Sequence, residues 1–284
     1  MLTSYLTRIG IALFLLIALC CLFGPLVHPL ATRAEPFLAP SWQHPFGTDD
    51  LGQDVLAGIL IGGRTSLFVG LIVGLVTTVV GVVVGGLAGY HKSLDVVLMR
   101  LVDLLLVIPR LPLLIFLSLL LKPSVWNVIV LLSVFGWPMT ARSVRPLVKA
   151  LAQADFVTAA RSLGGGHSYI FRRHLLPQLS SLFVVQFVLE ARYGVMAESG
   201  LGFLGLEDPT TKSWGMMLAY AFNHQATFVS DVWRWTVLPP ALALTAFLLS
   251  LSLMAAGMEG AMNPRIAARP RVTLKKEGKK REGK

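Results

Sequence analysis

The stretch DFVTAARSLGGGHSYIFRRHLLPQL, Asp155 to Leu179, lies between two apolar segments in the middle of the chain. Gly164 to Gly166 are expected to end a helix there, because glycine readily adopts the left-handed conformation. The pattern predicts a short helix over Asp155–Leu163 and a second one over residues 167–176 that ends before Pro177. One face of the first helix is made mostly of small residues: Ala152, Phe156, Ala159, Ala160 and Leu163.

The composition around this stretch is that of a membrane protein. Of 284 residues, 55% are hydrophobic and 14% are charged, whereas soluble domains are about a quarter charged. We attribute the net charge of +10 to the positive-inside bias of membrane proteins rather than to nucleic-acid binding. The two cysteines, Cys20 and Cys21, are adjacent within an apolar run, so they offer neither a disulfide framework nor a metal cluster.

Six apolar segments have about the length of a helix that spans a bilayer. Because backbone groups within lipid must satisfy one another, each segment is predicted to be helical, and the fold class is an all-α polytopic membrane protein. The third segment is interrupted by Pro109, Arg110 and Pro112. The predicted spans are 9–27, 66–89, 104–121, 125–141, 179–204 and 236–258.

Lysine and arginine are concentrated in the 142–178 loop and in the C-terminal tail. With six spans these two regions share one side with the N-terminus, and the positive-inside rule predicts that this side is cytoplasmic. The opening stretch is then a cytoplasmic loop between the fourth and fifth spans. The predicted organisation is an N-terminal transmembrane helix at 1–27, an extracytoplasmic loop at 28–65, a core of five transmembrane helices at 66–262 and a basic cytoplasmic tail at 263–284.

The second predicted span carries glycines at steps of four and seven, which place them on one helix face. Small residues let two helices approach closely, so this face is predicted to pack against another helix. The sequence leaves open whether that helix belongs to this chain or to a partner. The glycines are Gly70, Gly74, Gly81, Gly85 and Gly89.

Charged residues within the predicted spans are costly in lipid and need an explanation. Glu190 and Arg192 lie deep in the fifth span, and Glu198 lies near its outer end. Two interpretations remain open: these residues line a translocation pathway, or they pair structurally with another helix. Arg100 and Asp103, spaced i and i+3, are predicted to pair with each other.

Motifs for catalysis and nucleotide binding are weak. The sequence GILIGGRT, Gly58 to Thr65, is similar to a phosphate loop, but Arg64 replaces the lysine and no strand precedes it, so we predict no nucleotide binding. His28, His44 and His91 are interpreted as scattered interfacial residues. We therefore expect no catalytic residues, no bound cofactor and no metal in this chain, which is predicted not to be an enzyme.

The sequence TAARSLG followed by HLLP closely resembles the EAA loop of ABC-importer permeases. Thr158-Ala159-Ala160, Gly164 and the segment 174–177 fall at the matching spacing. Thr158 stands where the family usually has glutamate, and His174 stands where it usually has isoleucine. These departures leave the polar contacts with an ATPase unspecified, although the docking mode is kept.

Three further stretches resemble the dipeptide, oligopeptide and nickel permease subfamily, and within it the DppC/OppC-like subunit. They are His44–Leu67, Ala197–Leu218 and, more weakly, Leu94–Pro109. The similarity covers about residues 44–262. The outer sequence GTDDLGQD within the first stretch has two open interpretations: a turn with a capping aspartate before a helix, or a contact with a binding protein.

The resemblance implies the type I ABC-importer permease fold, with six transmembrane helices and cytoplasmic coupling helices. The chain would be a permease subunit of an ATP-driven importer for di- or oligopeptides, or for nickel and related small solutes, in a bacterial or archaeal plasma membrane with both termini cytoplasmic. Its implied partners are a second, DppB/OppB-like permease, two ATPase subunits that bind ATP and Mg, an extracytoplasmic solute-binding protein and the lipid bilayer. The implied ATPase-coupling residues are Asp155, Phe156, Thr158, Ala159, Ala160, Arg161, Leu163, Gly164 and Pro177.

Two other classes of function remain as alternatives. An ion-coupled secondary transporter would show broken helices, intramembrane carboxylates and an internal repeat; Glu190 fits this class, but no repeat is apparent. A membrane enzyme would need catalytic residues that converge at one membrane face, and none do. The cargo is not specified by the sequence, and peptides come before nickel only by frequency in the family.

Overall fold

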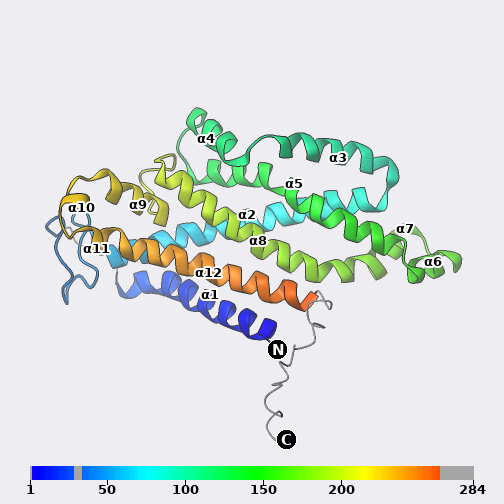
Figure 1. Cartoon of the computed structure of the whole chain (residues 1–284), viewed down its shortest axis with the longest axis horizontal. Coiled ribbons are helices and arrows are strands. Elements are labelled where there is room, and N and C mark those ends of the chain that lie inside the picture. The colour runs from blue at the N-terminus through cyan, green and yellow to red at the C-terminus, as the bar shows by residue number, and fades with distance from the viewer. Residues whose placement is uncertain (1, 29–33, 263–284) are drawn as a thin grey trace, which may run out of the picture.

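The computed structural model describes residues 2–28 and 34–262, and it is almost entirely helical (Figure 1). The predicted basic tail at 263–284 lies outside the described residues. The helices are α1 (Leu2–Val27), α2 (Val55–Tyr90), α3 (Lys92–Val107), α4 (Arg110–Leu120), α5 (Val125–Ala152), α6 (Asp155–Ser162), α7 (His167–Ile170), a π-helical turn (Phe171–Leu175), α8 (Leu176–Phe203), α9 (Trp214–Asn223), α10 (Ala226–Val229), α11 (Trp233–Thr236) and α12 (Leu238–Met262).

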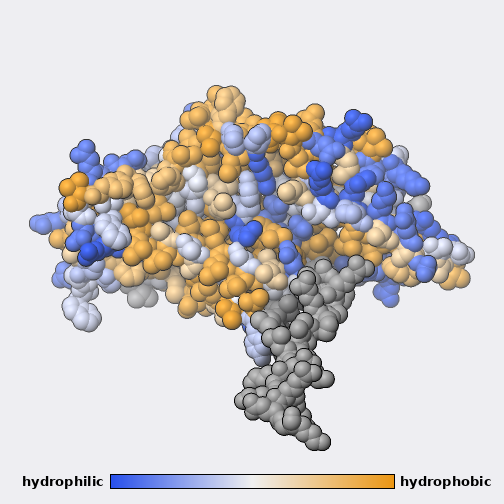
Figure 2. Space-filling model, viewed as in Figure 1, coloured by the Kyte–Doolittle hydropathy of each residue, from blue (hydrophilic) through white to orange (hydrophobic). Residues whose placement is uncertain are grey.

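Five helices of the described chain are long and apolar enough to cross a membrane, and α3 with α4 forms a sixth candidate span that is bent. The all-α polytopic fold is therefore confirmed. The long helices run side by side, with α6 and α7 at one end and residues 34–54 with α9, α10 and α11 at the other (Figure 1). Hydrophobic side chains cover much of the middle of the visible face, whereas hydrophilic ones gather towards the two ends (Figure 2).

The third span, predicted as one helix over 104–121, is instead broken by a bend of 79° between α3 and α4. Pro109 lacks an N–H group and disfavours a helical conformation at the residue before it, and Ile108 is accordingly extended. The predicted Arg100–Asp103 pair is also wrong, because Asp103 lies 3.7 Å from Arg142 of α5.

Helix α2 is the central element of the fold. It begins at Val55, about three helical turns before the predicted start of this span at residue 66, because the side chain of Asp54 caps it by accepting a hydrogen bond of 2.9 Å from Ala57 N. Its 36 residues correspond to about 54 Å of helix, which exceeds the ~30 Å hydrocarbon core of a bilayer. The helix packs mainly against α5 and α8, and also against α1.

The glycines of α2 face two helices of this same chain. A Cβ atom at Gly74 would lie 2.8 Å from Cβ of Ala191 on α8, and Gly70 also faces α8. The other three glycines, Gly81, Gly85 and Gly89, face α5. The glycine stripe thus lets α2 approach α5 and α8 at distances that larger residues would not permit.

The segment Gly58–Thr65 that is similar to a phosphate loop is part of the α2 helix. Its Arg64 has a structural partner in α1. Pro25 lies inside α1 and has no N–H group, so the carbonyl of Cys21 loses its usual helical donor. Arg64 Nε donates to that carbonyl at 2.9 Å, and Arg64 Nη2 donates to the carbonyl of Leu22 at 2.5 Å, which fastens α1 to α2.

We predict that Gly74→Ala destabilises the protein by about 1–3 kcal/mol, the usual cost of inserting atoms into a well-packed interface. The added methyl group would meet Ala191 of α8. Gly86→Ala on the same helix is the matched control, because a Cβ there would meet no atom within 4 Å. Thermal unfolding of both variants in detergent checks the prediction, and equal melting temperatures would contradict it.

Candidate functional site

Helix α6 is mounted on the end of the bundle through one buried side chain. Val157 is fully buried and packs in a small cluster with Ile170 of α7 and Leu175 of the π-helical turn. Tyr90 at the end of α2 and Leu151 near the end of α5 complete the surroundings of this cluster. The helix is therefore seated where α2 and α5 end and α8 begins.

The opposite side of α6 is apolar and exposed. Phe156 and Ala159 are exposed, and Leu163, directly after the helix, is 89% exposed. We call these three side chains the α6 face. Ala160, which the periodicity placed on the same face, is partly buried beside Val157, because the helix is only eight residues long and its inner side must cover the cluster.

A surface groove of about 600 Å³ opens beside the α6 face. Its floor includes Gly164, whose φ of +84° requires the left-handed conformation that glycine adopts without strain. Tyr169 and His174 line the other side, with ring centroids 5.6 Å apart. The three glycines thus end α6, as predicted, and they line the groove with backbone between the apolar side chains of α6 and the rings of Tyr169 and His174.

The polar residues of α6 point outward. Asp155 lies exposed in the first turn, and the side chains of Thr158 and Arg161 are exposed as well. Thr158 Oγ1 meets only the carbonyl of Ala154 within its own helical turn, at 3.5 Å. Arg161 extends over the ring of Tyr90, 5.9 Å from its centroid. The rim of the α6 face therefore carries groups of both charges.

The connection from α7 to α8 is continuous, whereas a helix that ends before Pro177 was expected. Residues Phe171–Leu175 form a π-helical turn in which Leu176 N donates to the carbonyl of Phe171. Pro177 follows in the first turn of α8, where a missing N–H group costs least. The wider π-helical turn accommodates Pro177 without interrupting the run of helical residues from α7 to α8.

Helix α5, which leads into α6, is fixed to α3 by a two-pronged ion pair. Arg145 Nη2 lies 2.6 Å from Asp95 Oδ2, and Arg145 Nε donates to the other carboxylate oxygen. Two parallel hydrogen bonds between a guanidinium and a carboxylate fix orientation as well as distance. The part of α5 next to α6 is therefore held to α3.

Glu190, in the middle of α8, is paired with a residue that the sequence reasoning treated only as an interruption. Arg110 of α4 places Nη2 3.6 Å from Glu190 Oε2 and lies 3.9 Å from the ring centroid of Tyr193. Thr140 of α5 donates to Glu190 Oε1 at 3.1 Å. This geometry fits the interpretation that Glu190 pairs structurally with another helix. The sequence feature that could have indicated this partner is Arg110, an arginine directly after the helix-breaking Pro109.

The other two charged residues of α8 lie apart from Glu190. Arg192 is exposed and donates to Ser252 of α12 at 3.2 Å, since residues two apart on a helix do not share a face. Glu198 is fully buried near the far end of α8 and accepts hydrogen bonds from Ser66 and Ser199. The three residues do not converge on one site.

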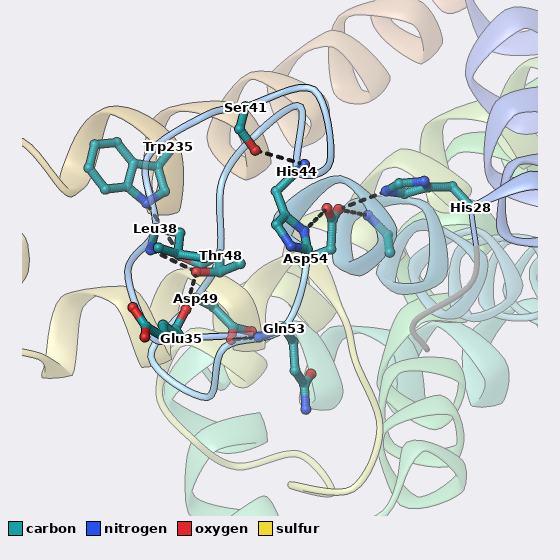
Figure 3. A network of polar contacts seen from close by, with 11 residues as sticks. His28, Glu35, Leu38, Ser41, His44, Thr48, Asp49, Gln53, Asp54 and Trp235 are labelled. Atoms are coloured by element: carbon teal, nitrogen blue, oxygen red, sulfur yellow. Dashed lines mark hydrogen bonds and ion pairs between the residues drawn. The ribbon is translucent and has the colours of Figure 1, made fainter. Parts of the chain in front are cut away.

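Two histidines that were interpreted as scattered meet at Asp54, at the end of the bundle opposite α6 (Figure 3). His44 Nδ1 lies 2.9 Å from one carboxylate oxygen of Asp54, and His28 Nε2 lies 3.2 Å from the other. Burial acts to raise the pKa of Asp54, but the hydrogen bonds from Ala57 N and the two histidines outweigh it and lower the pKa. The capping interpretation of GTDDLGQD is therefore confirmed.

The rest of this loop is held by hydrogen bonds within it and by side-chain contacts to later segments of the chain (Figure 3). Thr48 Oγ1 accepts from Leu38 N at 2.8 Å, and the carbonyl of Thr48 accepts from Trp235 Nε1 at 3.3 Å. Asp49 Oδ2 lies 3.4 Å from Lys212 Nζ.

A cavity of about 400 Å³ lies between the loop and α9. Within residues 2–28 and 34–262, no three His, Cys, Asp or Glu side chains are arranged to hold a metal ion.

We predict that Arg110→Met destabilises the protein by about 3–5 kcal/mol, because it leaves Glu190 buried without its cationic partner. The double variant Arg110→Met with Glu190→Gln should regain most of this loss. Arg192→Met is the control, since that arginine is exposed and bonds only a serine. Unfolding measurements in detergent check the series, and an unrescued double variant would show that the pair is not the cause.

We also predict that Asp54→Ala lowers the free energy of unfolding by about 1 kcal/mol, because the cap of α2 is lost. Asp54→Asn keeps an oxygen that can cap the helix and loses only the negative charge. The pKa of Asp54 is lowered from 3.8 in the folded protein. The stability that its negative charge adds is therefore present above pH 3.8 and is lost as the pH falls through the folded-state pKa. The stability difference between wild type and Asp54→Asn should therefore be constant near neutrality and shrink in acid. A difference that grows in acid would contradict this assignment.

Comparisons with known proteins agree with this architecture. Residues 77–268 match the family described as binding-protein-dependent transport system inner membrane component. A putative peptide permease of Brucella suis is 33% identical over 254 residues, which cover 86% of this chain and 83% of that protein. A putative peptide transport system permease of Brucella abortus is 33% identical over 91% of this chain and 88% of its own length. The dipeptide transport system permease DppC of Bacillus subtilis is 33% identical over 90% of this chain and 81% of its own length. As the resemblance predicted, the chain therefore belongs to the family of inner membrane components of binding-protein-dependent transport systems.

Proposed function

We propose that the chain is a transmembrane permease subunit of an ATP-driven importer for di- or oligopeptides, and that it couples ATPase motion to alternating access through α6. The single observation that carries the coupling is the exposed α6 face, mounted on a helix that links two candidate spans. The three relatives described above are named as peptide or dipeptide permeases, which favours peptides over nickel as cargo.

The proposed partners are a second permease subunit, two ATPase subunits and an extracytoplasmic solute-binding protein. ATP and Mg²⁺ would bind to the ATPase subunits, because this chain has a helix where a phosphate loop would be needed. We place α6 and both termini in the cytoplasm. The start of α1 and the end of α12 point towards the same end of the bundle as α6 (Figure 1), which supports this orientation.

The α6 face suits a protein groove better than a membrane surface. A helix that lies on a membrane carries bulky apolar residues and a strongly basic polar side. On α6, the small Ala159 lies between Phe156 and Leu163, and the rim carries Asp155 as well as Arg161. Such a face can enter a groove closely, as amphipathic helices do in partner proteins.

Motion of α6 would reach the candidate spans through two connections. Val157 locks α6 onto α7 and the π-helical turn, which continues into α8. Arg145 and Asp95 join the adjoining part of α5 to α3. A displacement imposed by the ATPases would thus tilt the helices on both sides of the loop and change access to the pathway. Pro138 and Pro146 inside α5 are places where that helix can bend.

An ion-coupled secondary transporter is the less favoured alternative. Glu190 suggested it, but this carboxylate is paired with Arg110 and accepts from Thr140. A carboxylate whose charge is already balanced is poorly suited to carry a transported ion. The family to which the chain belongs is also one of binding-protein-dependent systems.

We predict that Leu163→Glu reduces ATP-driven uptake by about tenfold or more, because the apolar contact is lost and a carboxylate would be desolvated without a partner at the proposed interface, and a loss of about 1.4 kcal/mol already corresponds to tenfold. Leu163 is 89% exposed, so its replacement should leave folding and membrane insertion unchanged. Uptake by the assembled transporter in proteoliposomes, together with ATP hydrolysis, is the measurement.

Gln153→Glu is the matched control for this experiment. Gln153 is exposed, caps the end of α5 and does not line the groove. Its replacement by glutamate therefore adds the same charge as Leu163→Glu, but outside the α6 face. Wild-type uptake by Leu163→Glu, or an equal loss in the control variant, would argue against coupling through this face.

A further inference from the structure

Two buried carboxyl groups lie where the far end of α8 meets α2 and α9. Glu198 on α8 is 1% exposed, and Glu207 in the loop after α8 is 2% exposed. Gly202 follows Glu198 by one helical turn, and a Cβ at Gly202 would lie 2.8 Å from Glu207 Oε2. The carboxyl group of Glu207 therefore rests on the same face of α8 as Glu198. We call these two residues the acid pair.

The groups that bind the acid pair are hydroxyls. Ser66 Oγ of α2 and Ser199 Oγ of α8 donate to Glu198 at 3.1 and 3.0 Å. Ser213 Oγ, which caps α9, donates to Glu207 Oε2 at 2.8 Å and also neighbours Glu198. The remaining oxygen of Glu207, Oε1, is buried and has no hydrogen-bond partner. One oxygen of the pair is thus left without the donor that an ionised carboxylate needs.

Among the described residues no cation pairs with either carboxyl group. The charged side chains that flank this site in sequence are engaged elsewhere: Arg64 donates to carbonyls of α1, and Lys212 bonds Asp49. Asp208 is partly exposed, and its carboxylate accepts from Thr210. Two buried carboxylates held only by hydroxyls would each cost several kcal/mol, and like charges so placed do not both ionise.

We propose that Glu198 and Glu207 form a proton-binding site that retains one proton at neutral pH and, in that form, fastens residues 204–213 to α2 and α8. The proton supplies the missing donor at Glu207 and removes one of the two buried charges. The site joins four segments, because Ser66 comes from α2, Glu198 lies on α8, Glu207 lies in the loop after α8, and Ser213 caps α9. Its occupancy sets how firmly the far end of α8 is held, whatever solute is transported.

The electrostatics agree with this geometry. Burial raises the pKa of the Glu207 carboxyl to about 7, although the hydrogen bond from Ser213 opposes the shift. A raised pKa means that the folded protein binds the proton more tightly than the unfolded chain does. The resulting stability is complete below the ordinary glutamate pKa of 4.5; it declines above that pH and is lost as the pH rises through the folded-state pKa of about 7.

The test compares thermal unfolding of the full chain in lipid nanodiscs between about pH 5 and about pH 8 for wild type and Glu207→Gln. Glutamine keeps the shape of the protonated acid and cannot ionise. We expect the midpoint of Glu207→Gln to rise relative to wild type by a few degrees as the pH increases over this range. Asp208→Asn is the control, because the partly exposed carboxylate of Asp208 has a lowered pKa and stays ionised throughout.

A difference between wild type and Glu207→Gln that is the same at every pH would overturn the proposal. If Glu207→Gln does not fold, Glu198→Gln is measured in the same way with the same expected trend. A wild-type midpoint at high pH that rises with added Na⁺ or Ca²⁺, but not in Glu207→Gln, would show a cation site instead of a proton site and would also overturn it. Infrared spectra should show a protonated carboxyl band at neutral pH that Glu207→Gln removes, and its absence in wild type would count against the site.

Discussion

The structure depends on the close approach of α2 to α5 and α8. Within a bilayer the lipid is as apolar as the helices, so association relies on tight packing and polar contacts rather than on the hydrophobic effect. Glycines on α2 supply that packing, with Gly74 against α8 and Gly81, Gly85 and Gly89 against α5. Because α5 and α8 are also the helices on either side of α6, a single glycine stripe aligns the two elements that must respond together.

Polar contacts fix the register that this packing leaves open. Arg64 donates to the α1 carbonyls next to Pro25, Arg110 meets Glu190, and Arg145 meets Asp95. Each contact joins a different pair of helices, and each would be lost if one helix shifted by a turn. The acid pair Glu198 and Glu207 differs, since among the described residues its hydrogen-bond donors are all hydroxyls. In the proposed site, a proton balances the buried negative charge, as Arg110 does for Glu190 and Arg145 does for Asp95.

Features that depend on local spacing could be predicted from the sequence. The glycine face of α2, the short helix ended by Gly164 and the capping aspartate of GTDDLGQD all follow from periodicity or turn chemistry. Contacts between distant residues could not: Arg110 and Glu190 are 80 positions apart, and His28 reaches Asp54 across a loop. The 79° bend at Pro109 was visible only as an interruption, because a proline breaks a helix without fixing the direction of the next one.

The two connections from α6 differ in stiffness, and this difference suggests where motion is absorbed. On the α5 side, the fork of Arg145 on Asp95 fixes both distance and angle to α3. On the α8 side, the chain passes through the π-helical turn Phe171–Leu175 and then Pro177, where the regular helical bonding is interrupted. Under the proposed coupling, the part of α5 at Arg145 would stay with α3 while α8 pivots at this turn. The far end of α8 would then move most, and that is where the acid pair holds it to α2 and α9.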